Sequence, residues 1–114
     1  MNITYKLEEI DFEWDSDKAE ANLQKHDVSF TEAGEVFLDP FVYPVEAREI
    51  DDEAREAAIG LTRKWRLPYV AYVWRKLTLR IISLRKATKT ERKHYENQSG
   101  CPPSGFFRLS AVDP

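Results

Sequence analysis

Apolar and polar residues follow two different periods along this chain, and the changes of period mark its expected elements. Residues 10–14 alternate apolar and acidic side chains, which is typical of a half-buried strand. Asp15 then provides a helix cap, and helical spacing predicts a helix over residues 16–26. Two stripes run along this predicted helix, one of Ala19, Leu23 and His26 and one of Lys18, Asn22 and Lys25.

A second helix is expected over residues 30–38. Ser29 and Glu32 have the spacing of a capping box, and apolar residues follow at helical spacing. Residues 41–47 resemble a strand, and Pro44 predicts that this strand lies at an edge, because proline cannot donate a hydrogen bond. The acidic residues 48–56 are expected to form a loop or turn.

Three consecutive strands are expected in the second half of the chain, over residues 57–62, 69–74 and 78–84. Short turns join them, which favours an antiparallel meander. A last helix is expected over residues 88–98, beginning at a capping box of Thr88 and Glu91. The predicted order is β-α-α-β-β-β-β-α, an α+β domain with a twisted, mainly antiparallel sheet partly covered by helices.

The chain has 114 residues, enough for one domain with a real core, which we expect over residues 1–98. Residues 99–114 are expected to be a C-terminal tail that either docks through its phenylalanines or is disordered. A single cysteine excludes an internal disulfide and suits a reducing, cytoplasmic environment. The N-terminal residues match neither a signal peptide nor a membrane anchor. No spacing of Cys and His suggests a metal site, so no cofactor is expected.

Charge is divided unevenly along the chain, although the net charge is only −3. Residues 1–60 carry 5 basic and 17 acidic side chains, whereas residues 61–95 carry 11 basic side chains and the single acid Glu91. The cations gather at the predicted turns and around residues 78–95, where a strand leads into a helix. Such a basic ledge suits a phosphate-rich ligand. A solvated basic helix beside an ordinary strand is the alternative.

The segments FEWDSDKAEANLQKHDVSFTEAGEVFLDP (12–40), AAIGLT (57–62) and RIISLRKATKTERKHYE (80–96) resemble the BrnT-type toxins. The resemblance covers about residues 10–97 in the family's order. One departure is Asp27, where the family often has glycine; aspartate tolerates a left-handed helix end less well than glycine, but better than most residues. The resemblance implies a RelE-like ribonuclease toxin of a bacterial type II toxin–antitoxin pair. It also implies a BrnA-like antitoxin of ribbon-helix-helix fold, which binds the toxin directly and with it represses their operon.

RNA cleavage by attack of a 2′-hydroxyl needs a base, an acid and cations aimed at the phosphate. Arg80 and Arg85 are our candidates for the cations, since a guanidinium matches two phosphate oxygens at once. Strict alternation places them on opposite faces, so they converge only if the strand ends or bulges near Leu84. The alternative is that one of the two pairs with an acid such as Glu13 or Glu32.

Lys25 and His26 are the candidates for proton transfer, with the assignment of base and acid left open. The alternative for His26 is a packed histidine at a helix end. A second group is expected to bind RNA, with Tyr95 stacking on a base: Lys86, Arg92, Tyr95, Arg66 and Arg75. Trp65, in a basic turn, either stacks on a base or anchors an antitoxin helix.

A catalytically inactive co-repressor or an RNA-binding module without cleavage remains the alternative function. The antitoxin is expected to contact residues 63–95 through acidic or hydrophobic anchors.

Overall fold

The computed structural model describes the backbone of residues 1–50 and 53–98, and the side chains of residues 1–45 and 54–98. The predicted tail, residues 99–114, lies outside the described residues, and so does part of the acidic loop expected at 48–56. The described chain forms one six-stranded sheet in the order β1-β2-β6-β5-β4-β3. All neighbouring strands are antiparallel except β2 and β6, which run parallel.

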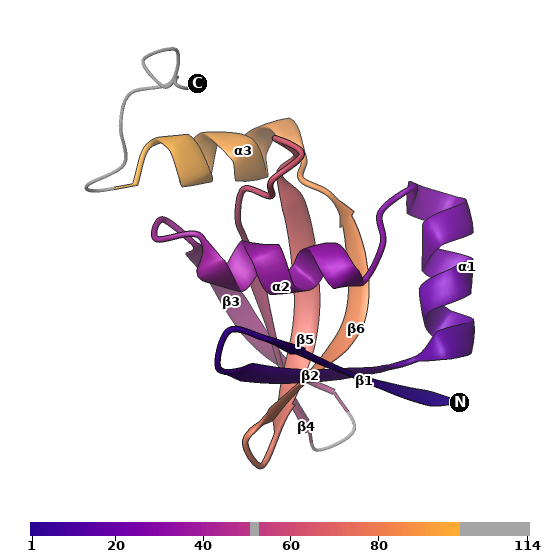
Figure 1. Ribbon diagram of the computed structural model, residues 1–114. Coiled ribbons are helices and arrows are strands. Elements are labelled where there is room, and N and C mark those ends of the chain that lie inside the picture. Colours follow the sequence, from indigo (N-terminus) through magenta and orange to yellow (C-terminus); the bar gives the residue numbers. More distant parts are fainter. Residues whose placement is uncertain (51–52, 99–114) are drawn as a thin grey trace.

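Three helices surround this twisted sheet (Figure 1). Strands β1 (Asn2–Leu7) and β2 (Ile10–Asp15) form an N-terminal hairpin, which α1 (Ser16–His26) and α2 (Thr31–Leu38) follow. The remaining elements are β3 (Tyr43–Ile50), β4 (Glu53–Ile59), β5 (Pro68–Arg75), β6 (Thr78–Lys86) and α3 (Lys89–Glu96). The α+β class and the meander of β4, β5 and β6 are as expected from the sequence.

Two features of the predicted order are wrong. The order missed β1, in which Ile3, Tyr5 and Leu7 alternate with exposed polar residues and contact the core. The acidic segment 48–56 is mostly strand, because β3 and β4 pair from Tyr43↔Ile59 to Ile50↔Glu53 as a long hairpin. In the acidic segment charged residues interrupt the apolar pattern of the sequence, whereas Ile3, Tyr5 and Leu7 of β1 have the alternation that is typical of a strand.

The main core lies between one face of the sheet and α2. Its buried side chains come from β2, α2 and the three central strands, and include Phe12, Ala33, Val36, Val70 and Leu84. A smaller cluster of Ile59, Leu67 and Tyr95 lies on the opposite face, where α3 covers the end of β4. We call these the α2 face and the opposite face. Because successive side chains of a strand point to opposite faces of the sheet, the strand pairing shows on which of these two faces each residue lies.

Helix ends follow the local signals in two of three cases. Asp15 caps α1 through Lys18 N at 3.1 Å, and Thr88 and Glu91 form the full capping box of α3. Asp27 ends α1 in the left-handed conformation, with φ 58°, at the position where the family often has glycine. At α2, Ser29 and Glu32 form only half of the expected box, with Ser29 N donating to Glu32 Oε2.

Candidate functional site

A β-bulge in β6 places Arg80 and Arg85 on the same face of the sheet. Ala71 pairs with Ser83 and Tyr72 pairs with Ile81, which leaves Ile82 as an extra residue without a cross-strand partner. Leu79 and Ile81 before the bulge and Leu84 after it all enter the core on the α2 face. Both arginines and Ser83 therefore lie on the opposite face. Their convergence required a bulge near Leu84, and the structure has one at Ile82.

Arg80 is held by acceptors of the N-terminal hairpin. Its Nη1 donates to Glu13 Oε2 at 3.1 Å and to Asn2 Oδ1 at 2.9 Å. The pairing with Glu13, which the sequence left open as the structural alternative, is confirmed. Among the described residues no acceptor contacts Nε or Nη2, so the side-on fork of this guanidinium is available for a phosphate.

Arg85 is held more completely than Arg80. Its Nη1 and Nη2 donate to the two carboxylate oxygens of Glu91 at 2.8 and 2.9 Å, and Nη1 also donates to the carbonyl of Lys86 at 3.1 Å. The guanidinium stacks 4.0 Å from the centre of the Tyr69 ring. The hydrogen bonds that Arg85 donates to Glu91 raise the pKa of Arg85 above its ordinary value. Among the described residues no acceptor contacts Nε, and Nη2, which bonds Glu91 through one N–H, has a second N–H on the Nε side.

Helix α1 brings Lys25 and His26 to the edge of β6. Beyond the short parallel pairing of β2 and β6, this helix packs along the outer side of β6, as Figure 1 shows. A shallow groove of about 390 Å³ lies between them. It is lined by Lys18, Ala21, Asn22, Lys25, His26, Ile82 and Ser83.

Ser83 connects this groove with the arginines. Arg85 lies two residues beyond Ser83 on the same face, roughly 7 Å along the strand. The groove of Lys25 and His26 thus adjoins β6 between the positions of Arg80 and Arg85. These four were the predicted catalytic residues.

Asn22 is the residue that docks α1, and the sequence analysis missed its role. Its side chain is buried; Oδ1 accepts from Leu84 N at 3.2 Å and Nδ2 donates to the Val28 carbonyl at 3.4 Å. The expected apolar stripe is only partly correct, because Leu23 is 40% exposed and the side facing β6 contains Lys18, Asn22 and Lys25. The sequence signal for this docking role was the position of Asn22 between Lys18 and Lys25 on one stripe of the helix.

Arg66 is held by acidic side chains of the protein itself. Its Nε donates to Glu32 Oε1 at 3.2 Å and its Nη2 bonds Glu32 Oε2, while Asp27 lies 4.0 Å from Nη1. Glu32 is buried, and its hydrogen bonds raise the pKa of Arg66 above the ordinary value. The pair fixes the β4–β5 loop on α2 and uses the donor fork that a phosphate would need. The structure therefore does not support the expected role of Arg66 in RNA binding.

The other expected RNA-binding residues are spread over the molecule. Lys86 and Arg92 are exposed at the end of β6 and on α3, near Arg85. Arg75 is exposed where β5 turns into β6, at the opposite end of the sheet. Tyr95 is 8% exposed in the Ile59 and Leu67 cluster, and its hydroxyl bonds Asp39 Oδ2. A ring buried in this way cannot stack on a base, so that expectation was wrong.

No group of three or more His, Cys, Asp or Glu side chains among residues 1–50 and 53–98 is arranged to hold a metal ion. Within the same residues, no helix has the length and apolar content needed to cross a bilayer.

The fold described above is a small α+β domain with a basic strand edge. The sequence model of a protein family, the ribonuclease toxin BrnT of type II toxin–antitoxin systems, matches residues 14–91 of this chain. The chain belongs to the BrnT family.

A solved structure agrees with this assignment. The crystal structure of the ribonuclease toxin BrnT from Brucella abortus is 26% identical, with a TM-score of 0.51. That match covers 67% of this chain and 94% of the other. A comparison with curated proteins found no match.

Proposed function

We propose that this chain is the toxin of a type II pair and cleaves RNA without a metal ion. A base takes the proton of a ribose 2′-hydroxyl, and the oxygen attacks the adjacent phosphorus. The bond to the 5′-oxygen breaks, and an acid protonates that leaving oxygen. The products are a 2′,3′-cyclic phosphate and a 5′-hydroxyl. These reaction steps need only a base, an acid and cations, which the side chains of the proposed site provide.

Arg80 and Arg85 stabilise the negative charge that develops on the non-bridging phosphate oxygens. Each guanidinium is oriented by an acid through Nη1, which removes the need to order a long side chain during the reaction. The Nε and Nη2 groups of Arg80 provide a donor fork for the phosphate, and Arg85 provides Nε and the second N–H of Nη2. Removing one such preorganised donor typically lowers the rate by about 10²–10³-fold.

Lys25 and His26 are the proton-transfer residues of this proposal. They line one groove with Ser83, beside the arginines. Histidine is suited to either role near neutral pH, whereas lysine serves as a phosphate ligand unless its surroundings favour the neutral amine. The pH–rate profiles of His26→Gln and Lys25→Met will show which of the two residues is the base and which is the acid.

The RNA backbone is proposed to continue from this site over Lys86 and Arg92, with Arg75 as a distant electrostatic contact. In the cytoplasm, a BrnA-like ribbon-helix-helix antitoxin neutralises the toxin and represses the operon with it. Growth then depends on the balance between the two proteins.

The bulge at Ile82 is the single observation that carries the catalytic proposal. Without it, Arg85 would point toward α2 and Arg80 away from it. The extra residue brings the two guanidinium groups and Ser83, the floor of the Lys25–His26 groove, to one face.

One observation favours a second candidate function. Each arginine contacts an acid, and Glu91 takes the end-on fork of Arg85. Purely structural ion pairs would look the same. A catalytically inactive co-repressor, or a module that binds RNA without cutting it, is therefore the competing function.

The test uses purified protein, a short RNA and excess EDTA. The proposal predicts cleavage that leaves a cyclic phosphate, is blocked by a single 2′-deoxy substitution at the cleaved position, and is at least about 100-fold slower in Arg80→Ala. Induced expression of the wild type alone should stop growth, and Arg80→Ala should not. RNA binding with no cleavage would favour the second candidate, and cleavage abolished by EDTA would contradict metal independence.

A further inference from the structure

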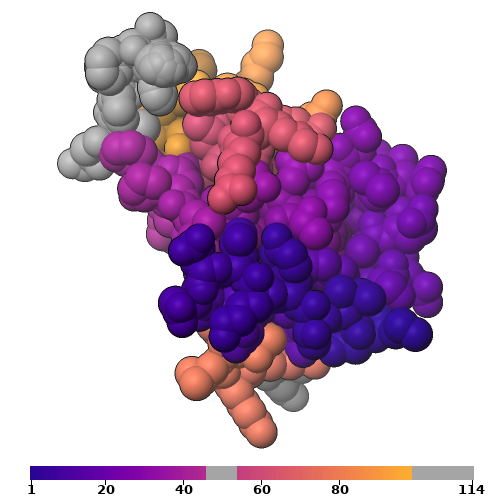
Figure 2. All heavy atoms as spheres, viewed as in Figure 1, coloured from indigo at the N-terminus to yellow at the C-terminus, as the bar shows by residue number. Residues whose placement is uncertain are grey.

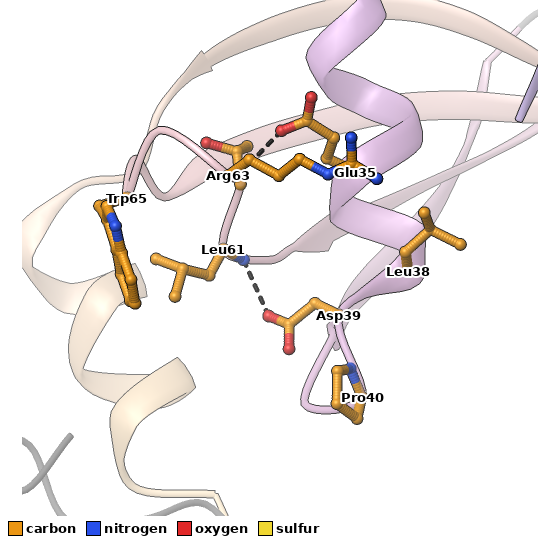
Figure 3. Close-up of a pocket in the computed structure, with 8 residues that line it drawn as sticks. Glu35, Leu38, Asp39, Pro40, Leu61, Arg63 and Trp65 are labelled. Carbon is orange, nitrogen blue, oxygen red and sulfur yellow. Dashed lines mark hydrogen bonds between the residues drawn. The ribbon is translucent and has the colours of Figure 1, made fainter. Parts of the chain in front are cut away.

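An apolar groove lies between the end of α2 and the β4–β5 loop, and neither Arg80 nor Arg85 lines it. It has a volume of about 330 Å³, and Figure 3 shows its lining side chains. Leu38, Pro40, Leu61 and Trp65 provide the apolar walls. Glu35, Asp39, Thr62 and Arg63 complete the lining.

Trp65 is unusual in both its exposure and its backbone. Its side chain is 68% exposed, and its φ of 62° lies in the left-handed region, which is unfavourable for a bulky residue. The turn holds this conformation, since Trp65 N donates to the Thr62 carbonyl and Thr62 N to the Arg66 carbonyl, both at 2.9 Å. The ion pair of Arg66 with the buried Glu32 fixes the turn on α2. The fold thus maintains a strained turn that presents a large apolar ring to solvent.

The acids of the groove are already satisfied within the chain. Asp39 accepts from Phe41 N, Leu61 N and the hydroxyl of Tyr95, and Glu35 accepts from Arg63 N at 2.8 Å. The Arg63 and Lys64 side chains are exposed, and among the described residues no acid pairs with either. The donors to Asp39 and Glu35 are neutral and orient the two carboxylates, whereas Arg63 and Lys64 are the exposed cations beside the apolar wall.

We propose that this groove is the anchor point of the antitoxin, a partner whose existence is part of the function proposed above. An apolar side chain of an antitoxin segment packs against the Trp65 indole and Leu61, and an acidic residue beside it pairs with Arg63 or Lys64. The exposed Arg63 and Lys64 suit an acidic residue of such a segment. The apolar side chains of Leu38, Pro40 and Leu61 favour a protein segment over RNA, because they give a base or a phosphate no polar partner.

The position of the groove also explains how an anchored partner silences the site. Leu61 packs in the same cluster as Tyr95 of α3, and Asp39 bonds the Tyr95 hydroxyl. The first turn of α3 contains Glu91, which holds Arg85. A segment that starts at Trp65 and continues along the cationic side of α3 reaches the catalytic arginine without entering the groove of Lys25 and His26.

The molecule contains a matched control for this proposal. Trp74 is 50% exposed near the tip of the β5–β6 hairpin, and Leu77 in the tip itself is 87% exposed. Figure 2 shows that tip projecting at the opposite end of the molecule from the β4–β5 loop. Trp74→Ala therefore removes an exposed indole of the same kind from the other end of the sheet.

The experiment measures the affinity of the purified toxin for the antitoxin encoded in the adjacent reading frame, by titration calorimetry. Trp65→Ala and Trp65→Gly should each weaken binding about 30-fold or more, which is typical of a central hot spot. Glycine suits the left-handed φ, so this variant keeps the turn and the fold. Arg63→Glu with Lys64→Glu should slow association, and Trp74→Ala should leave the affinity unchanged.

Three results would overturn the anchor site. They are unchanged affinity in Trp65→Gly, loss of affinity in Trp74→Ala instead, and loss of RNA cleavage by the free Trp65→Gly toxin while it still binds the antitoxin. A Trp65 indole already shielded from iodide in the free toxin, in a Trp74→Phe background, would show that residues 99–114 or a second copy fill the groove, and would also overturn it. If the wild type neither cleaves RNA nor stops growth, the proposed activity fails, while the binding data still test the anchor.

Discussion

Arg85 and Glu91 are joined by two parallel hydrogen bonds of 2.8 and 2.9 Å, between the end of β6 and the first turn of α3. Glu91 has a second task, since its Oε1 also accepts from Thr88 N at 2.9 Å to complete the capping box. One carboxylate therefore sets both the start of α3 and the direction of the Arg85 guanidinium. The Tyr69 ring supports that guanidinium from one side.

We predict that Glu91→Gln lowers the rate of RNA cleavage about tenfold, mainly in kcat. Glutamine keeps the capping box but loses the charge that orients Arg85, so the arginine samples other rotamers. Single-turnover cleavage at saturating RNA measures this effect directly. An unchanged rate would show that Glu91 serves α3 alone.

Thr88→Ala is the matched control, because it removes the cap and leaves the Arg85–Glu91 pair in place. It should cost about 1 kcal/mol of unfolding free energy and retain the cleavage rate. A fall in cleavage equal to that of Glu91→Gln would mean that helix fraying, and not the orientation of Arg85, accounts for both variants.

A second prediction concerns acid stability. The hydrogen bonds from Arg85 and the backbone of Thr88 lower the pKa of Glu91 below its ordinary value of 4.5. Between these two pKa values the unfolded chain binds more protons than the folded chain, so stability rises with pH across that window. The contribution of Glu91 is complete above pH 4.5 and is lost as the pH falls through its folded pKa.

Thermal unfolding between pH 7 and pH 3 measures this contribution. The Tm difference between the wild type and Glu91→Gln should be constant near neutral pH and should shrink below about pH 4.5, the ordinary value for glutamate. A difference that stays constant down to pH 3 would contradict the assignment. Gln98→Ala removes no titrating group, so the Tm difference between this variant and the wild type provides the baseline.

Much of the scaffold was predictable because its signals are local. The start of α1 follows from Asp15, and the start of α3 follows from Thr88 and Glu91. Short turns between apolar strands determined the antiparallel pairing of β4, β5 and β6. The parallel contact of β2 with β6 has no local signal, because it joins residues 11–13 with residues 78–80.

The candidate site was predictable in its residue types and not in its geometry. The bulge at Ile82 leaves no mark in the alternation of β6, since Ile81 and Ile82 are equally apolar. The partners of the arginines were identified only in part: Glu13 was considered for one of them, whereas Glu91 was assigned to capping alone. Tyr95 was misjudged because its helix is otherwise charged, so its burial depends on contacts with Ile59 and Leu67 of distant segments.

A third prediction tests how α1 is attached to β6. Asn22→Ala leaves Leu84 N and the Val28 carbonyl buried without partners, which should cost roughly 2 kcal/mol of unfolding free energy. Gln24→Ala on the exposed side of α1 should stay within about 0.5 kcal/mol. Urea denaturation of both variants makes the comparison. If the two variants prove equally stable, water must replace the Asn22 bonds.

Gly34 and Gly60, both in the described part of the chain, give a final prediction, in which one added methyl group meets different neighbours. In Gly60→Ala the new Cβ would lie 2.8 Å from both Cγ1 and the carbonyl oxygen of Val36. Val36 is fully buried in α2, so the backbone of β4 or α2 must move, and we expect a loss of about 2 kcal/mol or more.

In Gly34→Ala the closest atom is Leu7 Cδ2, also at 2.8 Å, but this methyl ends a flexible side chain on the edge strand β1. Alanine also favours the helical backbone of α2 by up to about 1 kcal/mol, which offsets the rearrangement of Leu7. The net change should therefore lie within about 1 kcal/mol of zero. Urea midpoints that rank Gly34→Ala below Gly60→Ala would mean that β1 is held more rigidly than its edge position implies.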